Sequence, residues 1–256
     1  MSPIVSVTAG VEASTPAARS LPVTSVHVWQ VPLLQPAGDV DALMATLSPD
    51  EAERARRFHF ARDRRRFVVA RGTLRRILAA YLGMPPEGVV FSYGARGKPF
   101  LAATHNPSDL RFNLAHAHEM ALFAFACRRE TGVDIEHIHP LPDAAAIAGR
   151  FFAAREYRAW LHLPEAQRLE GFFHCWTRKE AYIKAIGDGL SKPLDQFEVS
   201  LEAGETSCLL HVAGDPQEVE RWTLLPFPLA VEGYVAALAV EQRAPVQIET
   251  FTQIPA

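Results

Sequence analysis

The spacing of hydrophobic residues along the chain alternates between the period of strands and the period of helices. Residues Val26–Val31 alternate apolar and polar side chains, which predicts a strand. Ser48–Glu51 has the pattern of a helix start, with serine at the N-cap, proline in the first turn and glutamate closing a capping box. Helical spacing continues through Arg57 and again from about Asp63 to Leu82, where Gly83 ends it. Strands are also expected at Val89–Tyr93, Leu110–Leu114 and Met120–Cys127, with a turn at Gly94–Pro99.

The second half repeats this order of elements. A short strand at Gly132–Glu136 is followed by helical spacing, and a longer helix is expected from about Gly171 to Ile186, before the glycines at 187 and 189. The late segment Gly233–Ala239 is similar in pattern to Glu119–Phe125. The other expected elements are helices at Ala144–Phe152 and Glu156–His162 and strands at Phe197–Leu201, Cys208–Val212, Arg221–Leu225 and, as the last, Val231–Val240. We interpret the repeated order as an internal duplication with about 110 residues in each half.

This pattern predicts an α+β fold. Two similar α/β subdomains are expected to form a pseudo-dimer, each with a small, mostly antiparallel sheet packed against a long helix. Residues 1–22, rich in Ala, Ser, Thr and Pro, are expected to be a disordered leader. Residues 23–130 are expected to form the N-terminal subdomain and residues 131–256 the C-terminal subdomain.

The composition is that of a globular protein, with 48% hydrophobic and 21% charged residues. The sequence contains neither an apolar run long enough for a membrane span nor the pattern of a secretory signal, so a cytoplasmic location without a membrane partner is expected. The cysteines Cys127, Cys175 and Cys208 are odd in number and far apart, which argues against a disulfide framework and a Cys-based zinc site. Cys127 and Cys175 are expected to be core thiols.

Charge is distributed unevenly along the chain. The net charge is −3, but between Glu51 and Arg76 ten arginines face three acids, a local balance of +7 that leaves −10 for the remainder. A basic segment in a mildly acidic protein indicates a confined anionic ligand rather than a long polyanion such as a nucleic acid.

Two acidic residues share one face of a predicted strand. In Asp134-Ile135-Glu136 alternate side chains point the same way, so both carboxylates lie opposite Val133 and Ile135. Two carboxylates on one face repel unless a cation lies between them, and such hard oxygen ligands suit Mg²⁺. A solvated strand edge is the alternative interpretation of this pair taken alone.

A second candidate group lies on the long helix. Glu180 and Lys184 are four residues apart and therefore stack on one helix face. Either they form a surface ion pair of little energetic weight, or Glu180 is a third metal ligand or a general base and Lys184 holds a phosphate or leaving group. Three of the four lysines in the chain lie in or near this segment: Lys179, Lys184 and Lys192.

A third group precedes the middle of the chain. Arg111–His118 runs from a strand into a turn, where backbone N–H groups and the imidazole of His116 can meet an anion. Just upstream, Gly97-Lys98-Pro99 presents a lysine on a stiff turn. A structural role for the histidine is the alternative.

Together these segments resemble the phosphopantetheinyl transferases of the Sfp type, the double-length branch of that superfamily. The matching motifs, in the order and at the spacing of the family, are Gly97-Lys98-Pro99, Phe112–His116, Gly132–Glu136 and Trp176–Lys184. The resemblance spans about residues 25 to 240. It implies transfer of the 4′-phosphopantetheine arm of coenzyme A to a serine of an acyl or peptidyl carrier protein, with release of 3′,5′-ADP, by a monomeric enzyme.

The resemblance also implies roles for individual residues. Asp134, Glu136 and Glu180 would bind Mg²⁺, for which Mn²⁺ is an equivalent by ligand type, and Glu180 would accept the proton of the carrier serine. Lys184 would contact the phosphates and the departing 3′,5′-ADP. The residues expected to bind the nucleotide end of coenzyme A are Arg54, Arg66, Lys98, Pro99, Ala115 (through its backbone N–H) and His116. The chain departs from the family at Glu51, where a lysine is usual, and at Ala115 and Ala117, where serines are usual.

Two other classes of protein compete with this interpretation. A zinc hydrolase would use the pairs His116/His118 and His137/His139, each with two imidazoles on one strand face. A nucleic-acid-binding module would use the arginines and aromatic residues of segment 56–67, although the overall charge is unfavourable for it.

Overall fold

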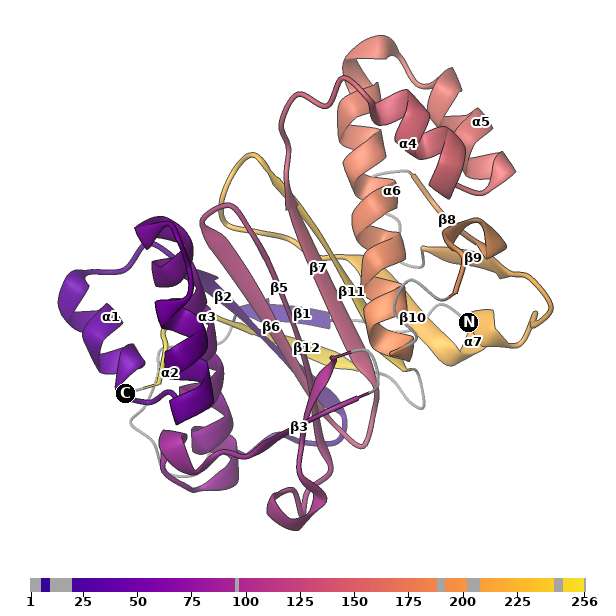
Figure 1. The fold of residues 1–256 in the computed structure, drawn as a ribbon. Helices are drawn as coiled ribbons and strands as arrows, with labels where there is room; N and C mark the ends of the chain where they lie inside the picture. The colour runs from indigo at the N-terminus through magenta and orange to yellow at the C-terminus, as the bar shows by residue number, and fades with distance from the viewer. Residues whose placement is uncertain are drawn as a thin grey trace.

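The computed structural model describes residues 6–9, 20–94, 97–187, 192–201, 208–241 and 246–255. Two helical bodies flank a central group of strands (Figure 1). The expected α+β fold of two similar subdomains is confirmed. No helix within the described ranges is both long and apolar enough to cross a lipid bilayer.

The first half is built on a sheet whose strands run in the order β1-β12-β2-β6-β5. Strand β2 pairs antiparallel with β6, and β6 pairs antiparallel with β5. The bounds of its elements are β1 Ser6–Ala9, β2 Ser25–Pro32, α1 Ala37–Met44, α2 Pro49–Arg56, α3 Ala61–Leu82, β5 Leu110–Ala117, β6 Met120–Cys127 and β12 Gln247–Phe251. A small hairpin, β3 Phe91–Tyr93 with β4 Pro99–Leu101, lies between α3 and β5, together with 3-10 turns at Pro86–Gly88 and Ala103–His105.

The second half has a sheet in the order β10-β11-β7, antiparallel throughout, packed against α6. Its elements are β7 Thr131–His137, α4 Ala144–Phe151, α5 Ala154–His162, α6 Glu165–Ile186, a 3-10 turn Leu194–Gln196, β8 Phe197–Val199, β9 Leu209–Val212, α7 Glu218–Arg221, β10 Trp222–Pro226 and β11 Tyr234–Glu241. The two halves pair their strands in the same order. In the first half β2 pairs with β6 and β6 with β5, and in the second half β7 pairs with β11 and β11 with β10. The corresponding pairs are β2 and β7, β6 and β11, and β5 and β10, with α3 corresponding to α6. This shared topology supports the internal duplication.

Three hydrophobic clusters hold the fold together. One lies between the first sheet and α3, and another between the second sheet and α6. The third lies between the two sheets and includes Val28, Leu122, Val133 and Leu238, all fully buried. The halves are therefore joined by a core of their own, as expected for a pseudo-dimer.

The local signals at helix ends agree with the structure. Ser48 is the N-cap of α2 with a capping box, in which the Ser48 N–H donates to Glu51. Gly83 and Gly187 end α3 and α6 in the left-handed conformation, at φ 64° and 78°. Such positive φ values cost little only for glycine.

Two expectations differ from the structure. The strand ending at Glu241 is not the last, because Gln247–Phe251 forms β12 and pairs parallel with β2, where Ile248 is buried. This strand belongs to the first sheet although its residues fall in the expected C-terminal subdomain, and its pairing depends on a long-range contact that five residues of local pattern do not reveal. The expected leader over residues 1–22 lies mostly outside the described residues; at Ser6–Ala9 the structure has a strand paired with β12 instead.

Candidate active site

Strand β7 carries two carboxylates on the face that looks away from the inter-sheet core. Val133 and Ile135 are buried in that core, and successive side chains of a strand point to opposite faces. Asp134 and Glu136 therefore share the other face. Asp134 is 5% exposed, whereas Glu136 is half-buried.

Helix α6 brings a third acid and a lysine to this strand. The helix approaches β7 so closely at Gly132 that a methyl group there would overlap the backbone of Ala181 and Ala185. Lys184 lies between these two alanines, and its Nζ donates to Oδ1 of Asp134 over 2.6 Å. Glu180 lies one turn earlier on the same helix, yet within the described ranges the ammonium pairs with Asp134 rather than with Glu180.

The three carboxyl groups perturb one another. Burial, with a smaller contribution from the charges of Glu136 and Glu180, raises the pKa of Asp134 to about 7 against the opposing effect of Lys184. Burial also raises the pKa of Glu136 and of Glu180, and Lys184 lowers both. Burial disfavours the charged form of these carboxyl groups, and a further cation beside them would stabilise that form.

The chemistry of this cluster fits a hard divalent cation. Oδ2 of Asp134 is buried and has no hydrogen-bond partner among the described residues. Carboxylate oxygens are the ligands that Mg²⁺ prefers. As the side chains stand, no three His, Cys, Asp or Glu residues of the described ranges converge closely enough to hold a metal ion, and the ammonium of Lys184 supplies the positive charge at Asp134.

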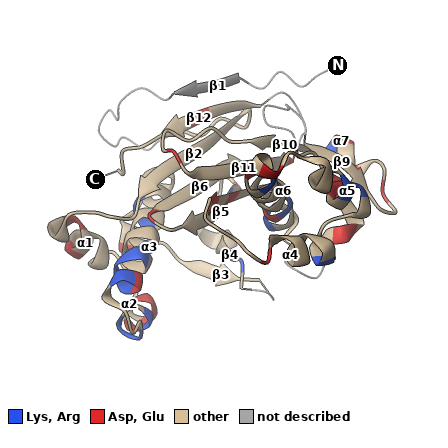
Figure 2. Ribbon diagram, turned by 90° about the horizontal axis from the view of Figure 1, so that it is seen from above, with Lys and Arg blue, Asp and Glu red and all other residues tan. Residues whose placement is uncertain are grey.

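A basic cavity of about 620 Å³ lies in the first half, between α2–α3 and β5. Its lining residues are Arg54, Phe58, Asp63, Arg66, Phe67, Ala70, Arg71, Leu114, His116 and His118. Basic residues gather on α3, and α2 carries both basic and acidic residues (Figure 2). Arg54 lies over the ring of Phe67 at 5.1 Å and makes no ion pair with any residue the structure describes. Arg66 is held by Glu119 at 2.6 Å.

His116 belongs to the same cavity and lies on β5. Partial burial lowers its pKa, and the charges of Lys184 and Arg66 lower it further. The imidazole is thus close to the cations of both halves. Ala115, the residue before it, turns its side chain into the inter-sheet core and is 4% exposed. It pairs with Leu122 of β6 and does not line this cavity.

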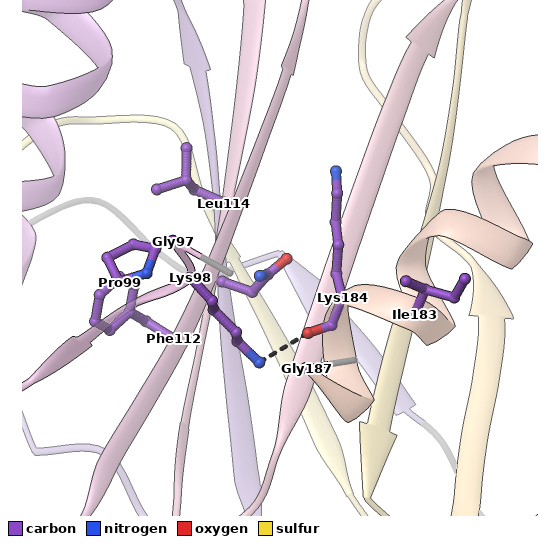
Figure 3. A pocket seen from close by; sticks show the side chains of 9 residues that line it. Gly97, Lys98, Pro99, Phe112, Leu114, Ile183, Lys184 and Gly187 are labelled. Atoms are coloured by element: carbon purple, nitrogen blue, oxygen red, sulfur yellow. Dashed lines mark hydrogen bonds between the residues drawn. The ribbon is translucent and has the colours of Figure 1, made fainter. Parts of the chain in front are cut away.

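A smaller cavity of about 250 Å³ lies where the two halves meet (Figure 3). Lys98 and Pro99 form one wall of it, and Ile183, Lys184 and Gly187 form the other. Nζ of Lys98 donates to the backbone oxygen of Lys184 over 2.7 Å, and burial lowers the pKa of Lys98. The two cavities share Leu114 and therefore adjoin. Of the expected site residues, the larger cavity is lined by Arg54, Arg66 and His116 and the smaller one by Lys98, Pro99 and Lys184. The acids of β7 and α6 and Ala115 line neither cavity, and the acids meet the smaller one through the ion pair of Asp134 with Lys184.

Two functional roles were not recognised from the sequence. Oδ1 of Asn113 accepts the N–H of Val133 over 2.9 Å and so joins β5 to β7 beside Asp134. The motif that contains Asn113 was recognised, but no local pattern in the sequence predicts that its partner is Val133, 20 residues away. Glu51, where the family usually has a lysine, is buried and accepts hydrogen bonds from Arg71 and Arg75.

The histidines do not form the site that a zinc hydrolase needs. His118 and His137 stack at 4.8 Å, whereas His139 packs against Phe173 and its Nδ1 lies 2.7 Å from the oxygen of His137. The four histidines of the two pairs therefore do not converge on one point. This agrees with the absence of a three-ligand cluster within the described ranges.

The aromatic residues of segment 56–67 do not form a stacking surface. Phe58 and Phe67 pack on each other at 5.3 Å and line the basic cavity, and Phe67 also joins the first core. Phe60 alone of the three is largely exposed. Four of the ten arginines between Glu51 and Arg76 are held by buried or half-buried acids: Arg62, Arg66, Arg71 and Arg75.

Comparison with known proteins shows the family of the chain. Residues 130–239 match the family model described as the 4′-phosphopantetheinyl transferase superfamily, and residues 35–128 match that of the 4′-phosphopantetheinyl transferase N-terminal region. The chain belongs to the 4′-phosphopantetheinyl transferase superfamily and is an enzyme of this class. With both halves matched, it is of the Sfp type, the double-length branch.

Individual relatives span most of the chain. The transferase HetI of a Nostoc species is 44% identical over 84% of this chain and 87% of its own. Sfp of Bacillus subtilis is 30% identical over 73% of this chain and 81% of its own. The human L-aminoadipate-semialdehyde dehydrogenase-phosphopantetheinyl transferase is 29% identical over 69% and 62%. A solved holo-[acyl-carrier-protein] synthase of Thermotoga maritima shares 22% identity over 44% of this chain and 62% of that one, with a TM-score of 0.35, too low to support an argument.

Proposed function

We propose that this enzyme transfers the 4′-phosphopantetheine moiety of coenzyme A to a specific serine of an acyl or peptidyl carrier protein and releases 3′,5′-ADP in a Mg²⁺-dependent reaction. The observation that carries the proposal is a basic cavity that adjoins a smaller one lined by Lys184, whose ammonium pairs with Asp134 of the acidic cluster. The cavity suits the phosphates of the nucleotide end, and the cluster suits the reacting pyrophosphate.

The N-terminal subdomain, residues 23–130, binds coenzyme A in this proposal. Arg54, Arg66 and His116 contact phosphate groups, and Lys98 and Pro99 form the wall beyond them. Support comes from Arg54, which has no ion pair among the described residues and is free to meet an anion. A contact through the backbone N–H of Ala115 would survive the change from serine, whereas a contact through the serine hydroxyl would not.

The C-terminal subdomain, residues 131–256, supplies the metal and catalytic residues. Asp134, Glu136 and Glu180 would hold Mg²⁺, and Mn²⁺ would satisfy the same oxygen ligands. When bound, the cation supplies positive charge to the pyrophosphate oxygens and to the leaving phosphate. The buried oxygen of Asp134 without a partner supports this assignment.

The reaction breaks a phosphoanhydride bond and forms a phosphodiester. The oxygen of the carrier serine forms a bond to the β-phosphorus, and the bond from that phosphorus to the oxygen bridging the two phosphates breaks. The serine proton passes to the carboxylate of Glu180. Lys184 turns from Asp134 toward the departing phosphate and stabilises its charge.

Intact mass spectrometry of an apo carrier protein tests the proposal. After incubation with the enzyme, coenzyme A and Mg²⁺, the carrier should gain the mass of one phosphopantetheine arm, and EDTA should prevent the gain. Glu180→Ala should abolish the gain while the circular dichroism spectrum stays that of the wild type. No gain on fatty-acid, polyketide and peptide carriers, with coenzyme A still bound, would refute the proposal.

A further inference from the structure

Lys98 uses its ammonium group to join the two halves of the enzyme. Nζ donates to the backbone oxygen of Lys184 at 2.7 Å and approaches that of Ala185 at 3.4 Å. Oε2 of Glu130 lies 3.6 Å away and balances the charge. The side chain of Lys98 is 27% exposed, so this contact lies at the edge of the cavity rather than in open solvent.

The two backbone oxygens belong to the last turn of α6. The final carbonyls of a helix have no partner within the helix, and the negative end of its dipole attracts a cation. The N–H of Gly187 donates to the oxygen of Ile183 and leaves those of Lys184 and Ala185 to other donors. Lys98 reaches them from the turn before β4 in the first half (Figure 3).

Lys184 of α6 is therefore held at two places. Its backbone oxygen contacts Lys98 of the first half, and its own ammonium contacts Asp134 of β7 over 2.6 Å. We propose that Lys98 is a positioning residue, which holds the last turn of α6 so that Lys184 faces Asp134 and the transferring phosphate. The aliphatic stem of Lys98 still forms a wall of the cavity, but its charge serves α6 rather than the nucleotide.

The kinetic test of this inference rests on the proposed function. It distinguishes a ligand of the nucleotide from a residue that positions Lys184. A ligand of the nucleotide contributes to binding, so its loss raises KM for coenzyme A and weakens binding of 3′,5′-ADP. A residue that positions Lys184 contributes to the transition state, so its loss lowers kcat and leaves those affinities unchanged.

The test compares Lys98→Met, which keeps the stem, with Lys98→Arg, which restores a donor. Lys98→Met should lower kcat about ten- to a hundredfold, the effect of a small displacement near the reacting atoms, with KM for coenzyme A within about twofold of wild type. Lys98→Arg should recover most of kcat. Lys192→Met is the matched control, because Lys192 lies over the ring of Tyr182, and it should leave kcat unchanged.

A double-mutant cycle with Lys184→Met tests whether Lys98 acts through Lys184. In that background Lys98→Met should cause no further loss of kcat, because coupled residues are not additive. Amide hydrogen exchange, which needs no carrier protein, should be faster at residues 183–187 in Lys98→Met than in wild type. Should Lys98→Met not fold, Lys98→Gln takes its place in both measurements.

A higher KM and weaker calorimetric binding of 3′,5′-ADP with kcat unchanged would overturn the inference and make Lys98 a nucleotide ligand. Additive losses in the cycle, or unchanged exchange at residues 183–187, would overturn it as well. If wild type transfers nothing to any carrier, the proposed function fails, while the exchange experiment still decides the role of Lys98.

Discussion

The close approach of β7 to α6 at Gly132 is what holds Asp134 at its place beside Lys184. A Cβ atom at position 132 would overlap the backbone of Ala181 and would lie 2.9 Å from Cα of Ala185. Backbone atoms of a helix cannot turn aside as a side chain can. Because non-bonded carbon atoms pack at about 3.5 Å or more, Gly132→Ala must move the strand away from the helix by on the order of 1 Å.

The expected loss can be worked out from this displacement. Overpacking of a buried contact costs about 1–3 kcal/mol, and a clash with backbone belongs at the upper end. In a protein of this size 1 kcal/mol lowers Tm by about 2–4 °C, so about 3 kcal/mol predicts a fall of about 6–12 °C. A shift of this size also stretches the 2.6 Å contact between Lys184 and Asp134 beyond hydrogen-bond range, so kcat should fall about a hundredfold.

Two other glycines supply the controls. At Gly72, a Cβ would lie 2.8 Å from both the Cβ and the backbone oxygen of Leu43, so Gly72→Ala should also destabilise the protein, but far from the acidic cluster and with kcat retained. At Gly38 nothing lies within 4 Å, so Gly38→Ala should not lower Tm. The assays are thermal unfolding and the rate of carrier modification well below every Tm. A wild-type Tm and kcat for Gly132→Ala would refute the reasoning, as would an equal loss of kcat in Gly72→Ala.

Three further predictions concern the charged groups. Asp134→Ala should lower carrier modification at least about a thousandfold with little change in Tm, and near-normal turnover would contradict its assignment to the metal. Arg54→Ala should raise KM for coenzyme A about tenfold at low ionic strength, with a smaller effect in high salt because of screening; a KM equal to that of wild type would exclude Arg54 from binding. Burial raises the pKa of Glu51, but the hydrogen bond from Arg75 and the charge of Arg71 outweigh it, and the net pKa is lowered. Glu51→Gln should therefore lower Tm above about pH 5, and the difference from wild type should shrink as the pH falls through the depressed pKa; a difference independent of pH would contradict this.

The sequence predicts those parts of the fold that depend on neighbouring residues. The alternation around Val133 and Ile135 identified β7, and glycines at 83 and 187 ended the long helices at the right residue. These signals are local, because an N-cap, a left-handed glycine or a two-residue period acts within one turn or one strand. Helix α1 gave no such signal, since its N-cap is Pro36 and no side chain caps it.

The parts that were not predicted depend on contacts between distant residues. The pattern at Glu180 and Lys184 predicted a shared helix face, but the partner of Lys184 is Asp134, 50 residues away. Glu51 was understood only as a departure from a family pattern, although it forms a buried ion pair with two arginines of α3. Asn113 likewise has its partner across the junction of the halves. In each case the residue type is compatible with several partners, and the packing of the two halves selects one.

The duplicated topology explains why the acidic cluster lies in one half and the cations in the other. Strand β2 and the end of α3 correspond to β7 and the end of α6. In the first half this contact is formed by Nδ1 of His27 at 2.7 Å from the hydroxyl of Tyr81, a contact between groups that need carry no charge. In the second half the same contact is the ion pair of Asp134 with Lys184. Glu249 lies 3.4 Å from Nε2 of His27, but the first contact has no lysine. In the function proposed above, only the second contact therefore serves a cation and a phosphate, and the first half forms the wall that binds the nucleotide. Two equal copies would bury two such clusters at the expense of stability, which this division of roles avoids.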